Sequence, residues 1–397
     1  MEGTDLDNIR IGIIGIGNMG TSHARKLASG AIPNATLTAV CDIKVSAEQW
    51  TRDNLPESVQ CWSDAEQMMD SGTIDAVLIA TPHYSHPQLA IQAFERGLHV
   101  LIEKPAGVYT KQVREMNEAA VKSGKVFSIM YNQRTNPLYL KLKDIIASGE
   151  LGEIRRTNWI ITNWYRSQSY YDSGGWRATW SGEGGGVLIN QDPHQLDLWQ
   201  WAIGMMPIRV RAFCSFGKYR NIEVEDDVTA YVEYANGASG VFVTTTGEAP
   251  GTNRLEVTGD RGKIVIEDGH MTFWRLRELE SEFNQRYKGG FGEPEHWKCD
   301  IPIMGKETGH PGIIENWIEA ITKGTPLLAP GEEGIKGLSL SNAMYLSTWL
   351  DDWVTLPIDE ELFLAQLQQR INSSTGEKKR NSNNDSEAVD ISKTFGN

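Results

Sequence analysis

Cysteine is scarce in this chain of 397 residues. The four that occur are Cys41, Cys61, Cys214 and Cys299, and they form neither a CxxC pair nor a regular spacing. Such usage is typical of reduced intracellular proteins and argues against a disulfide framework or a cysteine-bound zinc site. The histidines are dispersed as well and show no ligand spacing, so we expect no metal.

The chain also lacks long apolar runs and an excess of basic residues. No stretch of about 18 apolar residues occurs, and the first ten residues, MEGTDLDNIR, are acidic and lack the apolar core of a secretion signal. Lysine and arginine number 38 against 52 aspartates and glutamates, a net charge of -14. Nucleic acid and anionic membranes are therefore poor partners, and we expect a soluble cytoplasmic protein.

The length exceeds what one core ordinarily holds, so two domains are expected. In the first third of the chain, short apolar runs alternate with amphipathic segments, the runs covering 9–16, 37–42, 75–81, 99–104 and 125–131. This alternation predicts a doubly wound parallel sheet of the Rossmann type over residues 1–131, and hence an α/β protein.

Beyond residue 131 the pattern becomes a series of long alternating segments. Asn236-Gly237 separates two of them and predicts a tight hairpin, because both turn positions favour positive φ. We therefore expect a second α/β domain over residues 132–371, built on a large, mostly antiparallel sheet. Residues 372–397 are polar with few large apolar side chains, and we expect a disordered tail.

A glycine-rich turn joins the first predicted strand to the first predicted helix: Gly15-Ile16-Gly17-Asn18-Met19-Gly20. In a dinucleotide site Gly15 permits the turn, Gly17 lets the pyrophosphate approach and Gly20 allows close helix packing, while the helix N-terminus attracts the anion. Asp42, at the end of the next strand, would bind the adenosine ribose and repel a 2′-phosphate. NAD is therefore favoured, and the nearby Lys44 leaves NADP as the alternative.

Two further strand ends face the same crevice, where open sheets bind ligands. One carries Ala80, Thr81, Pro82, His83 and His86, and the other Glu103 and Lys104. A lysine before proline is held extended, so Lys104 would point toward the nicotinamide half of the cofactor. An ordinary solvated lysine is the alternative.

Aromatic residues are concentrated between residues 159 and 180. Seven lie there, against a chain average of 9%: Trp159, Trp164, Tyr165, Tyr170, Tyr171, Trp176 and Trp180. Their faces can stack on sugar rings while Arg166 and Arg177 bind hydroxyls, so the stretch suits a carbohydrate pocket. About half of these rings are expected in the core or an interface. Trp176 and Arg177 are expected near cofactor and substrate.

Several of these motifs together resemble the Gfo/Idh/MocA oxidoreductases, a family named after glucose-fructose oxidoreductase and inositol dehydrogenase. They are IGIIGIGNMG, ATPHYSH at 80–86, EKP at 103–105, YNQR at 131–134 and GGGVLINQDPHQLD at 184–197. The resemblance covers residues 9–355. It implies an NAD(P)-dependent enzyme acting on a sugar, polyol or related ring, with an open sheet that often mediates homodimers or homotetramers.

The resemblance also implies catalytic roles for Lys104, beside nicotinamide and substrate, and for His194, in acid–base chemistry. The family's aspartate position falls on Asn190, a neutral side chain that would hold a substrate hydroxyl rather than take its proton. Asp192 before Pro193 is expected to cap a helix, with catalysis as the alternative. A helix that instead began at the glycines should kink at Pro193. For His194 itself, a structural role is the alternative.

The expected substrate-binding side chains surround these residues: Lys104, Asn132, Arg134, Trp164, Tyr165, Tyr171, Asn190, Asp192, His194 and His310. We expect a dehydrogenase in which His194 accepts the proton of a secondary hydroxyl of a sugar, glycoside or cyclitol while Lys104 stabilises the developing alkoxide. One alternative is an NAD-retaining glycosidase or lyase acting through a transient 3-keto sugar, with a tyrosine or His310 as its second base. The other is a non-catalytic NAD-binding protein.

Overall fold

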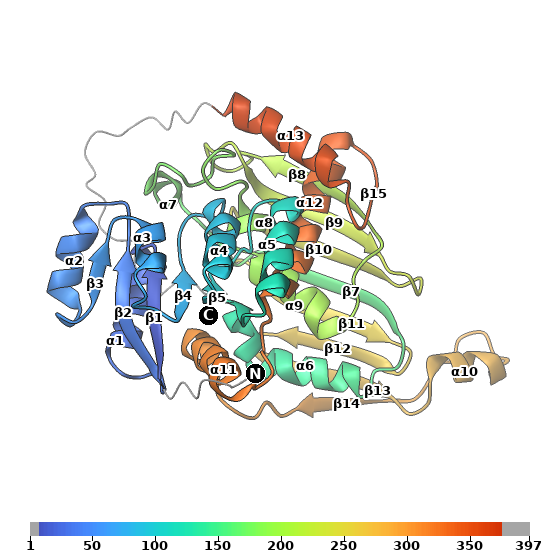
Figure 1. Ribbon diagram of the computed structural model, residues 1–397. Helices are drawn as coiled ribbons and strands as arrows, with labels where there is room; N and C mark the ends of the chain where they lie inside the picture. The colour runs from blue at the N-terminus through green and yellow to red at the C-terminus, as the bar shows by residue number, and fades with distance from the viewer. Residues whose placement is uncertain (1–7, 375–397) are drawn as a thin grey trace.

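The computed structural model describes residues 8–374 and contains two sheets with helices packed between and around them (Figure 1). The last described helix, α13 (Glu360–Ser373), includes the first two residues of the expected tail. The rest of that tail, from residue 375, lies outside the described residues. Among the helices that the structure describes, none has both the length and the apolar character that crossing a bilayer requires.

The first sheet is parallel, with strand order β3-β2-β1-β4-β5-β6. Its strands are β1 (Ile9–Ile14), β2 (Ala35–Cys41), β3 (Gln60–Trp62), β4 (Ala76–Ile79), β5 (His99–Ile102) and β6 (Phe127–Ile129). The intervening helices are α1 (Asn18–Ala28), α2 (Ser46–Asn54), α3 (Ala65–Asp70), α4 (Ser85–Glu95) and α5 (Thr110–Ser123). This is the doubly wound Rossmann arrangement predicted from the alternating pattern. Only β3 has no counterpart in the prediction.

The central strands carry almost only apolar residues because helices cover both faces of the sheet. All four residues of β4 are buried, as are five of the six residues of β1. The strand order reverses between β1 and β4, and open sheets bind ligands at the carboxyl ends of the strands at such a point.

The second sheet has nine strands in the order β14-β13-β12-β11-β7-β10-β9-β8-β15. Only β7 and β10 pair in parallel, so the sheet is mostly antiparallel, as expected. The strands are β7 (Ile154–Ile161), β8 (Arg209–Phe216), β9 (Glu225–Glu233), β10 (Ser239–Thr245), β11 (Asn253–Gly259), β12 (Gly262–Glu267), β13 (His270–Leu276), β14 (His296–Ile301) and β15 (Val354–Thr355). Gly237, at φ +84°, closes the predicted hairpin between β9 and β10.

The remaining helices join the two sheets or border the second one. They are η1 (Asn132–Thr135), α6 (Pro137–Ala147), α7 (Gln168–Asp172), α8 (Val187–Asn190), α9 (Pro193–Ile203), α10 (Glu280–Arg286), α11 (Gly309–Lys323), η2 (Gly331–Glu333) and α12 (Gly334–Leu350). Helix α12 packs against α5 of the first domain and against α9 and β8 of the second. In Figure 1 these helices lie between the blue strands and the green and yellow ones.

The segment after the glycine run forms two short helices instead of one kinked helix. Helix α8 ends at Asn190, and α9 begins at Pro193, whose missing N–H would leave a gap inside a continuous helix. Every residue of α9 is buried, because the helix packs against α6 and α12 and, through Trp199, against Thr157 and Phe242 of the second sheet. The segment that carries Asn190 and His194 is therefore held on several sides.

Candidate active site

The glycine turn has a distinct steric reason at each glycine. Gly15 adopts φ +94°, and a Cβ there would lie 2.6 Å from the carbonyl oxygen of Ala80. A Cβ on Gly20 would lie 1.8 Å from the carbonyl oxygen of Gly15. A Cβ on Gly17 would meet nothing within 4 Å. Gly15 and Gly20 therefore serve the packing of turn and helix, whereas Gly17 borders open space at the N-terminus of α1, where a phosphate can approach.

Asp42 closes the other side of this turn. Its Oδ2 accepts a hydrogen bond from the N–H of Ile16 at 2.7 Å, and its Oδ1 accepts one from the N–H of Lys44 at 2.9 Å. A cavity of about 460 Å³ lies beside it, lined by Ile16, Asp42, Lys44, Ser46, Ala47, Gln49, Trp50, Asp53 and Asn54. A cavity lined by a carboxylate, a tryptophan ring and other polar side chains fits the ribose and base of an adenosine. The residues present therefore fit the NAD that the motif predicts.

The other turn residues frame the same crevice. Asn18 and Met19 begin α1, and Asn18 is exposed. Ala80 donates to the carbonyl of Ile14 at 2.8 Å, and the Thr81 hydroxyl accepts from Ser85 at 2.7 Å. Pro82 is exposed next to them. These expected cofactor contacts remain predictions.

Lys104, at the end of β5, reaches across to the second domain. Its Nζ donates a hydrogen bond of 2.8 Å to the backbone carbonyl of Asn190. Burial lowers the pKa of this ammonium, and the carboxylates of Glu103 and Glu183 oppose that change. The titratable and charged groups around Lys104 are two carboxylates, Glu103 and Glu183, two guanidiniums, Arg166 and Arg177, and four histidines, His83, His86, His194 and His310.

Glu103 is fully engaged by a histidine of the nucleotide-binding helix. Its Oε1 lies 2.7 Å from Nε2 of His23 on α1, and both side chains are buried. Burial raises the pKa of Glu103, but the hydrogen bond and charge of His23, with His310 and Lys104, outweigh burial and hold the pKa at about 2. Glu103 is therefore an anion that braces β5 against α1 and faces the Lys104 ammonium.

His194 lies in the first turn of α9, and only 2% of the residue is exposed. Its ring packs edge-on against Tyr131, with ring centroids 6.1 Å apart. Burial, with the charges of Lys104 and His310, holds the pKa of His194 well below its usual range. Burial likewise lowers the pKa of His310 to about 4. Both imidazoles are therefore neutral at physiological pH, and a neutral imidazole can accept a proton.

Asn190 belongs to a compact polar group. Its Nδ2 donates to Glu183 and, at 3.2 Å, to the hydroxyl of Tyr170. Arg177 also donates to that hydroxyl, at 3.0 Å, and its guanidinium lies over the rings of Tyr170 and Trp176, at 4.8 and 4.7 Å from their centroids. The sequence-predicted Trp176, Arg177 and Asn190 therefore meet in one place.

His83 connects this group to the first domain. Its ring lies edge-on to that of Trp176, with centroids 5.7 Å apart, and its Nδ1 makes a 3.0 Å hydrogen bond with the carbonyl oxygen of Glu183. His83 is buried, unlike Trp176 and Arg177, which are half-buried. The aromatic loop, defined as residues 162–180 between β7 and the glycine run, is thus joined to the loop that follows β4.

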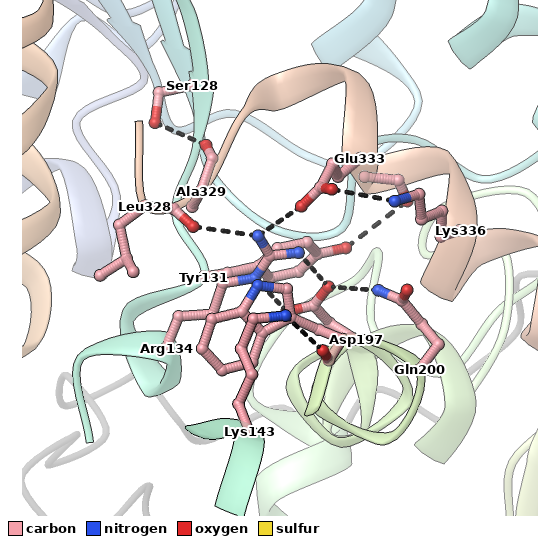
Figure 2. Close-up of polar contacts among 12 residues, drawn as sticks. Ser128, Tyr131, Arg134, Lys143, Asp197, Gln200, Leu328, Ala329, Glu333 and Lys336 are labelled. Carbon is pink, nitrogen blue, oxygen red and sulfur yellow. Dashed lines mark hydrogen bonds and ion pairs between the residues drawn. The ribbon is translucent and has the colours of Figure 1, made fainter. Parts of the chain in front are cut away.

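Arg134 was expected to bind substrate, and the structure contradicts this. Its guanidinium is completely buried and donates to both oxygens of Asp197, at 2.8 and 2.7 Å, to Glu333 and to the carbonyl of Leu328 (Figure 2). Four of its five N–H groups are therefore used inside the protein. Arg134 joins η1 to α9 and η2.

Asp192 was expected to cap α9 and to line the substrate site, and neither role agrees with the structure. The residue is at the N-cap position, but its carboxylate caps no backbone N–H. It is completely buried near the Thr244 hydroxyl and the Trp164 indole, and burial raises the pKa of Asp192 to about 8. The proline at the first position of α9 removes one N–H that a cap would serve.

Other residues expected to contact substrate or cofactor have partners within the protein or are buried. Tyr171 is buried, with its hydroxyl donating to Thr246 at 2.8 Å, whereas Tyr165 is half-exposed under Arg220. His86 is buried between the carbonyl oxygens of Thr81 and Pro105, at 2.7 and 2.8 Å, so it braces two strand ends instead of contacting a cofactor. Asn132 is buried in η1.

Sequence reasoning did not assign to the site three residues that lie around Glu103, Lys104 and Asn190: His23, Tyr170 and Glu183. Glu183 directly precedes the glycine run, and its position there was the available signal. Tyr170 was named only as one aromatic among seven. His23 had no signal, because its partner Glu103 lies 80 residues away.

Comparisons with known proteins agree with this architecture. Residues 9–131 match the model of the oxidoreductase family with an NAD-binding Rossmann fold, and residues 139–265 match that of the GFO/IDH/MocA C-terminal domain. Levoglucosan dehydrogenase of Pseudarthrobacter phenanthrenivorans is 26% identical over 89% of this chain and 99% of its own. The NAD(+)-dependent scyllo-inositol 2-dehydrogenase of Bacillus subtilis is 28% identical over 65% of this chain and 73% of its own.

Among solved structures, the WlbA dehydrogenase of Bordetella pertussis, in complex with NADH and UDP-GlcNAcA, has a TM-score of 0.74. It is 26% identical and covers 89% of this chain and 100% of its own. With the glycine turn, the strand-end lysine and both matching domain models in place, the chain belongs to the Gfo/Idh/MocA family of NAD-binding oxidoreductases.

Proposed function

We propose that this oxidoreductase transfers hydride between NAD and a secondary hydroxyl of a sugar, glycoside or cyclitol. The observation that carries the proposal is the convergence of Lys104, Asn190 and His194 at the crevice beside the glycine turn. Relatives named for levoglucosan and scyllo-inositol, and a solved structure in complex with UDP-GlcNAcA, support this substrate class. All three compounds contain a hydroxylated ring.

The residues divide the chemistry among themselves. NAD, held at the Gly17 turn and by Asp42, supplies the hydride acceptor when bound. Lys104 donates a hydrogen bond to the substrate oxygen and stabilises its developing negative charge. His194, neutral because it is buried, accepts the hydroxyl proton. Asn190 orients a neighbouring hydroxyl.

The aromatic loop forms the wall for the sugar ring. Tyr170 and Trp176 present half-buried rings beside Asn190, and Arg177 lies over both of them. Aromatic faces pack on the C–H faces of sugars, while amide and guanidinium groups bind hydroxyls. Tyr165 and Tyr171, which were expected here, point elsewhere and are not part of the proposal.

The proposal includes the assembly and the compartment. Exposed aromatic residues, among them Phe213 and Tyr231, lie on neighbouring strands β8 and β9 of the second sheet. An exposed apolar face of this kind suits a homodimer or homotetramer. The chain's acidic charge and scarce, unpaired cysteines suit the cytoplasm.

The test is NADH formation by the purified protein, followed by absorbance, with hexoses, cyclitols, anhydrosugars and glycosides. We expect activity with one of these classes and a loss of at least about 100-fold in His194→Ala and Lys104→Ala, as for lost acid–base groups. The exposed His270 and Lys298 provide matched controls as His270→Ala and Lys298→Ala. Wild-type rates in the site variants would refute the assigned roles. Aglycone release without NADH would replace the dehydrogenase by the lyase alternative.

A further inference from the structure

A buried carboxylate lies directly behind Asn190. Glu183 is 1% exposed, and its two oxygens accept hydrogen bonds from different groups, Oε1 from the Asn190 amide and Oε2 from the N–H of Ala178 at 2.5 Å. Both partners are N–H donors, which is the environment that suits an ionised carboxylate, since it only accepts hydrogen bonds. The site therefore contains a negative charge close to the position where the family has aspartate.

This carboxylate determines which way the Asn190 amide faces. An ionised carboxylate only accepts hydrogen bonds, so the Nδ2 of Asn190 must point toward Glu183. The second hydrogen of Nδ2 is directed at the Tyr170 hydroxyl, 3.2 Å away. Both hydrogens of the amide are thereby used, and Asn190 offers a ligand only its oxygen, an acceptor for a substrate O–H.

The same carboxylate acts on Lys104. The lysine binds the backbone carbonyl of Asn190 at 2.8 Å, and Glu183, like Glu103, opposes the effect of burial on the pKa of this ammonium. Of these two carboxylates, Glu103 is already paired with His23. The guanidiniums and histidines around Lys104 that are named above disfavour its charge or are neutral. Glu183 thus helps to keep Lys104 protonated.

We propose that Glu183 is a positioning residue that supplies, through the Asn190 amide, the negative charge that the family resemblance places at position 190 itself. The proposal rests on the dehydrogenase function proposed above. It explains why Asn190 is neutral. An aspartate at 190 beside Glu183 would put two carboxylates in contact, and like charges in a buried site cannot both ionise. The residues at 183 and 190 are therefore coupled.

The coupling can be tested by exchanging the charge between the two positions. In Glu183→Gln alone, the new amide oxygen must face the Ala178 N–H, because that group can only donate. The new NH2 group then faces Asn190, so the Asn190 amide turns its oxygen toward residue 183 and presents its NH2 group, a donor, to the ligand. In Asn190→Asp alone, two carboxylates meet. In the double variant, the new amide at position 183 donates to the new carboxylate at position 190, and its oxygen accepts from Ala178. The hydrogen bonds are then restored, and the negative charge has moved from residue 183 to residue 190.

We expect each single variant to lose roughly tenfold or more in kcat/KM, as for a perturbed acid–base site, and the double variant to recover most of that loss. In Glu183→Gln the alkaline limb of the pH profile should move to lower pH, because Lys104 loses a stabilising anion, and return in the double variant. Glu223→Gln, a nearby carboxylate bonded to Ser374, is the control and should leave the profile unchanged.

A second readout needs no activity. The titration of Lys104, followed by NMR of carbon-labelled lysine and assigned with Lys104→Met, should shift to lower pH in Glu183→Gln and back in the double variant. An unchanged titration, or a double variant no better than either single one, would overturn the proposal. If Glu183→Gln does not fold, the proposal is tested by comparing Asn190→Asp with the double variant, which should have the higher kcat/KM. An inactive wild type with the expected titration would refute only the dehydrogenase function.

Discussion

At the residue scale, burial and charged partners compete at each titratable group. Burial favours the neutral form, so it lowers the pKa of His194 and Lys104 and raises that of Asp192. Glu103 differs from these three groups, since His23 beside it reverses the effect of burial on its pKa. His194 and Lys104, the two groups proposed to handle protons, are therefore buried near the charged carboxylate of Glu103.

The depressed pKa values of His194 and Lys104 predict the pH dependence of catalysis. His194 stays neutral to below pH 6.5, its ordinary pKa, so the acid limb of kcat/KM should lie below that value. Lys104 loses its proton below its ordinary value of 10.5, so the alkaline limb should lie below that value too. Profiles of kcat/KM for the wild type and His194→Asn would measure this. An acid limb at or above pH 6.5 would contradict the assignment.

The raised pKa of Asp192 predicts an effect on stability. Its pKa is about 8 in the folded protein and about 3.9 in an unfolded chain. The folded state therefore binds the proton more tightly, and stability falls as pH rises from about 4 to about 8. Asp192→Asn, which removes this titration, should stabilise the protein on the order of a few kcal/mol at pH 8 and less at pH 5.

Urea unfolding of wild type and Asp192→Asn at the two pH values measures the effect. The exposed Asp300→Asn is the matched control, with no pH-dependent difference expected. A variant that is equally or more destabilised at pH 8 than at pH 5 would show that the buried carboxylate is not protonated.

At the element scale, the dinucleotide turn separates packing from binding. A Cβ on Gly20 would collide with the backbone of Gly15, whereas a Cβ on Gly17 points into open space. Replacing Gly20 should therefore weaken the fold, whereas replacing Gly17 should weaken cofactor binding. Only the effect of replacing Gly17 depends on a cofactor.

Alanine substitutions test this division. Gly20→Ala should destabilise the fold by roughly 2–4 kcal/mol, because α1 must move away from β1. Gly17→Ala should fold like the wild type but bind NADH at least about tenfold more weakly, because the methyl group occupies the path of the pyrophosphate. Thermal unfolding and NADH titration by fluorescence distinguish the two. Normal NADH affinity in Gly17→Ala would place the phosphates elsewhere.

At the scale of the whole molecule, a buried ion-pair network joins three helices that are distant in the sequence, η1, α9 and η2. Arg134 follows the last strand of the first sheet, and its partners Asp197 and Glu333 come from α9 and η2 (Figure 2). Asp197 lies one helical turn after His194, so the network also fixes the helix that carries the proposed base.

Removing one partner of this network should be costly. Arg134→Met leaves Asp197 buried without its cation, and we expect a loss of about 3–5 kcal/mol in the free energy of unfolding. Arg155→Met removes an exposed arginine that pairs with Asp260 and Glu280, and should cost no more than about 1 kcal/mol. Denaturant unfolding compares them. Equal losses in the two variants would mean that the buried pair has no special role.

Much of the architecture could be predicted, because it depends on local patterns. Apolar runs, the Asn236-Gly237 turn and the glycine turn each determine their own conformation within a few residues. The short strand β3, with one exposed and two half-buried residues, lacked such a pattern and was missed. Lys104 was correctly predicted to follow an apolar strand, because the residue before a proline is restricted to extended conformations. It lies two residues after the end of β5.

The sequence by itself determined the two kinds of sheet, the cofactor turn and the family, since each rests on spacing along the chain. Only the tertiary structure decided which polar side chains meet. Arg134 and Asp197 are 63 residues apart, so no local pattern could show that they pair instead of binding substrate. Asp192 turned from cap to buried acid for the same reason. A side chain's charge and partners depend on burial, and burial is a property of the whole fold.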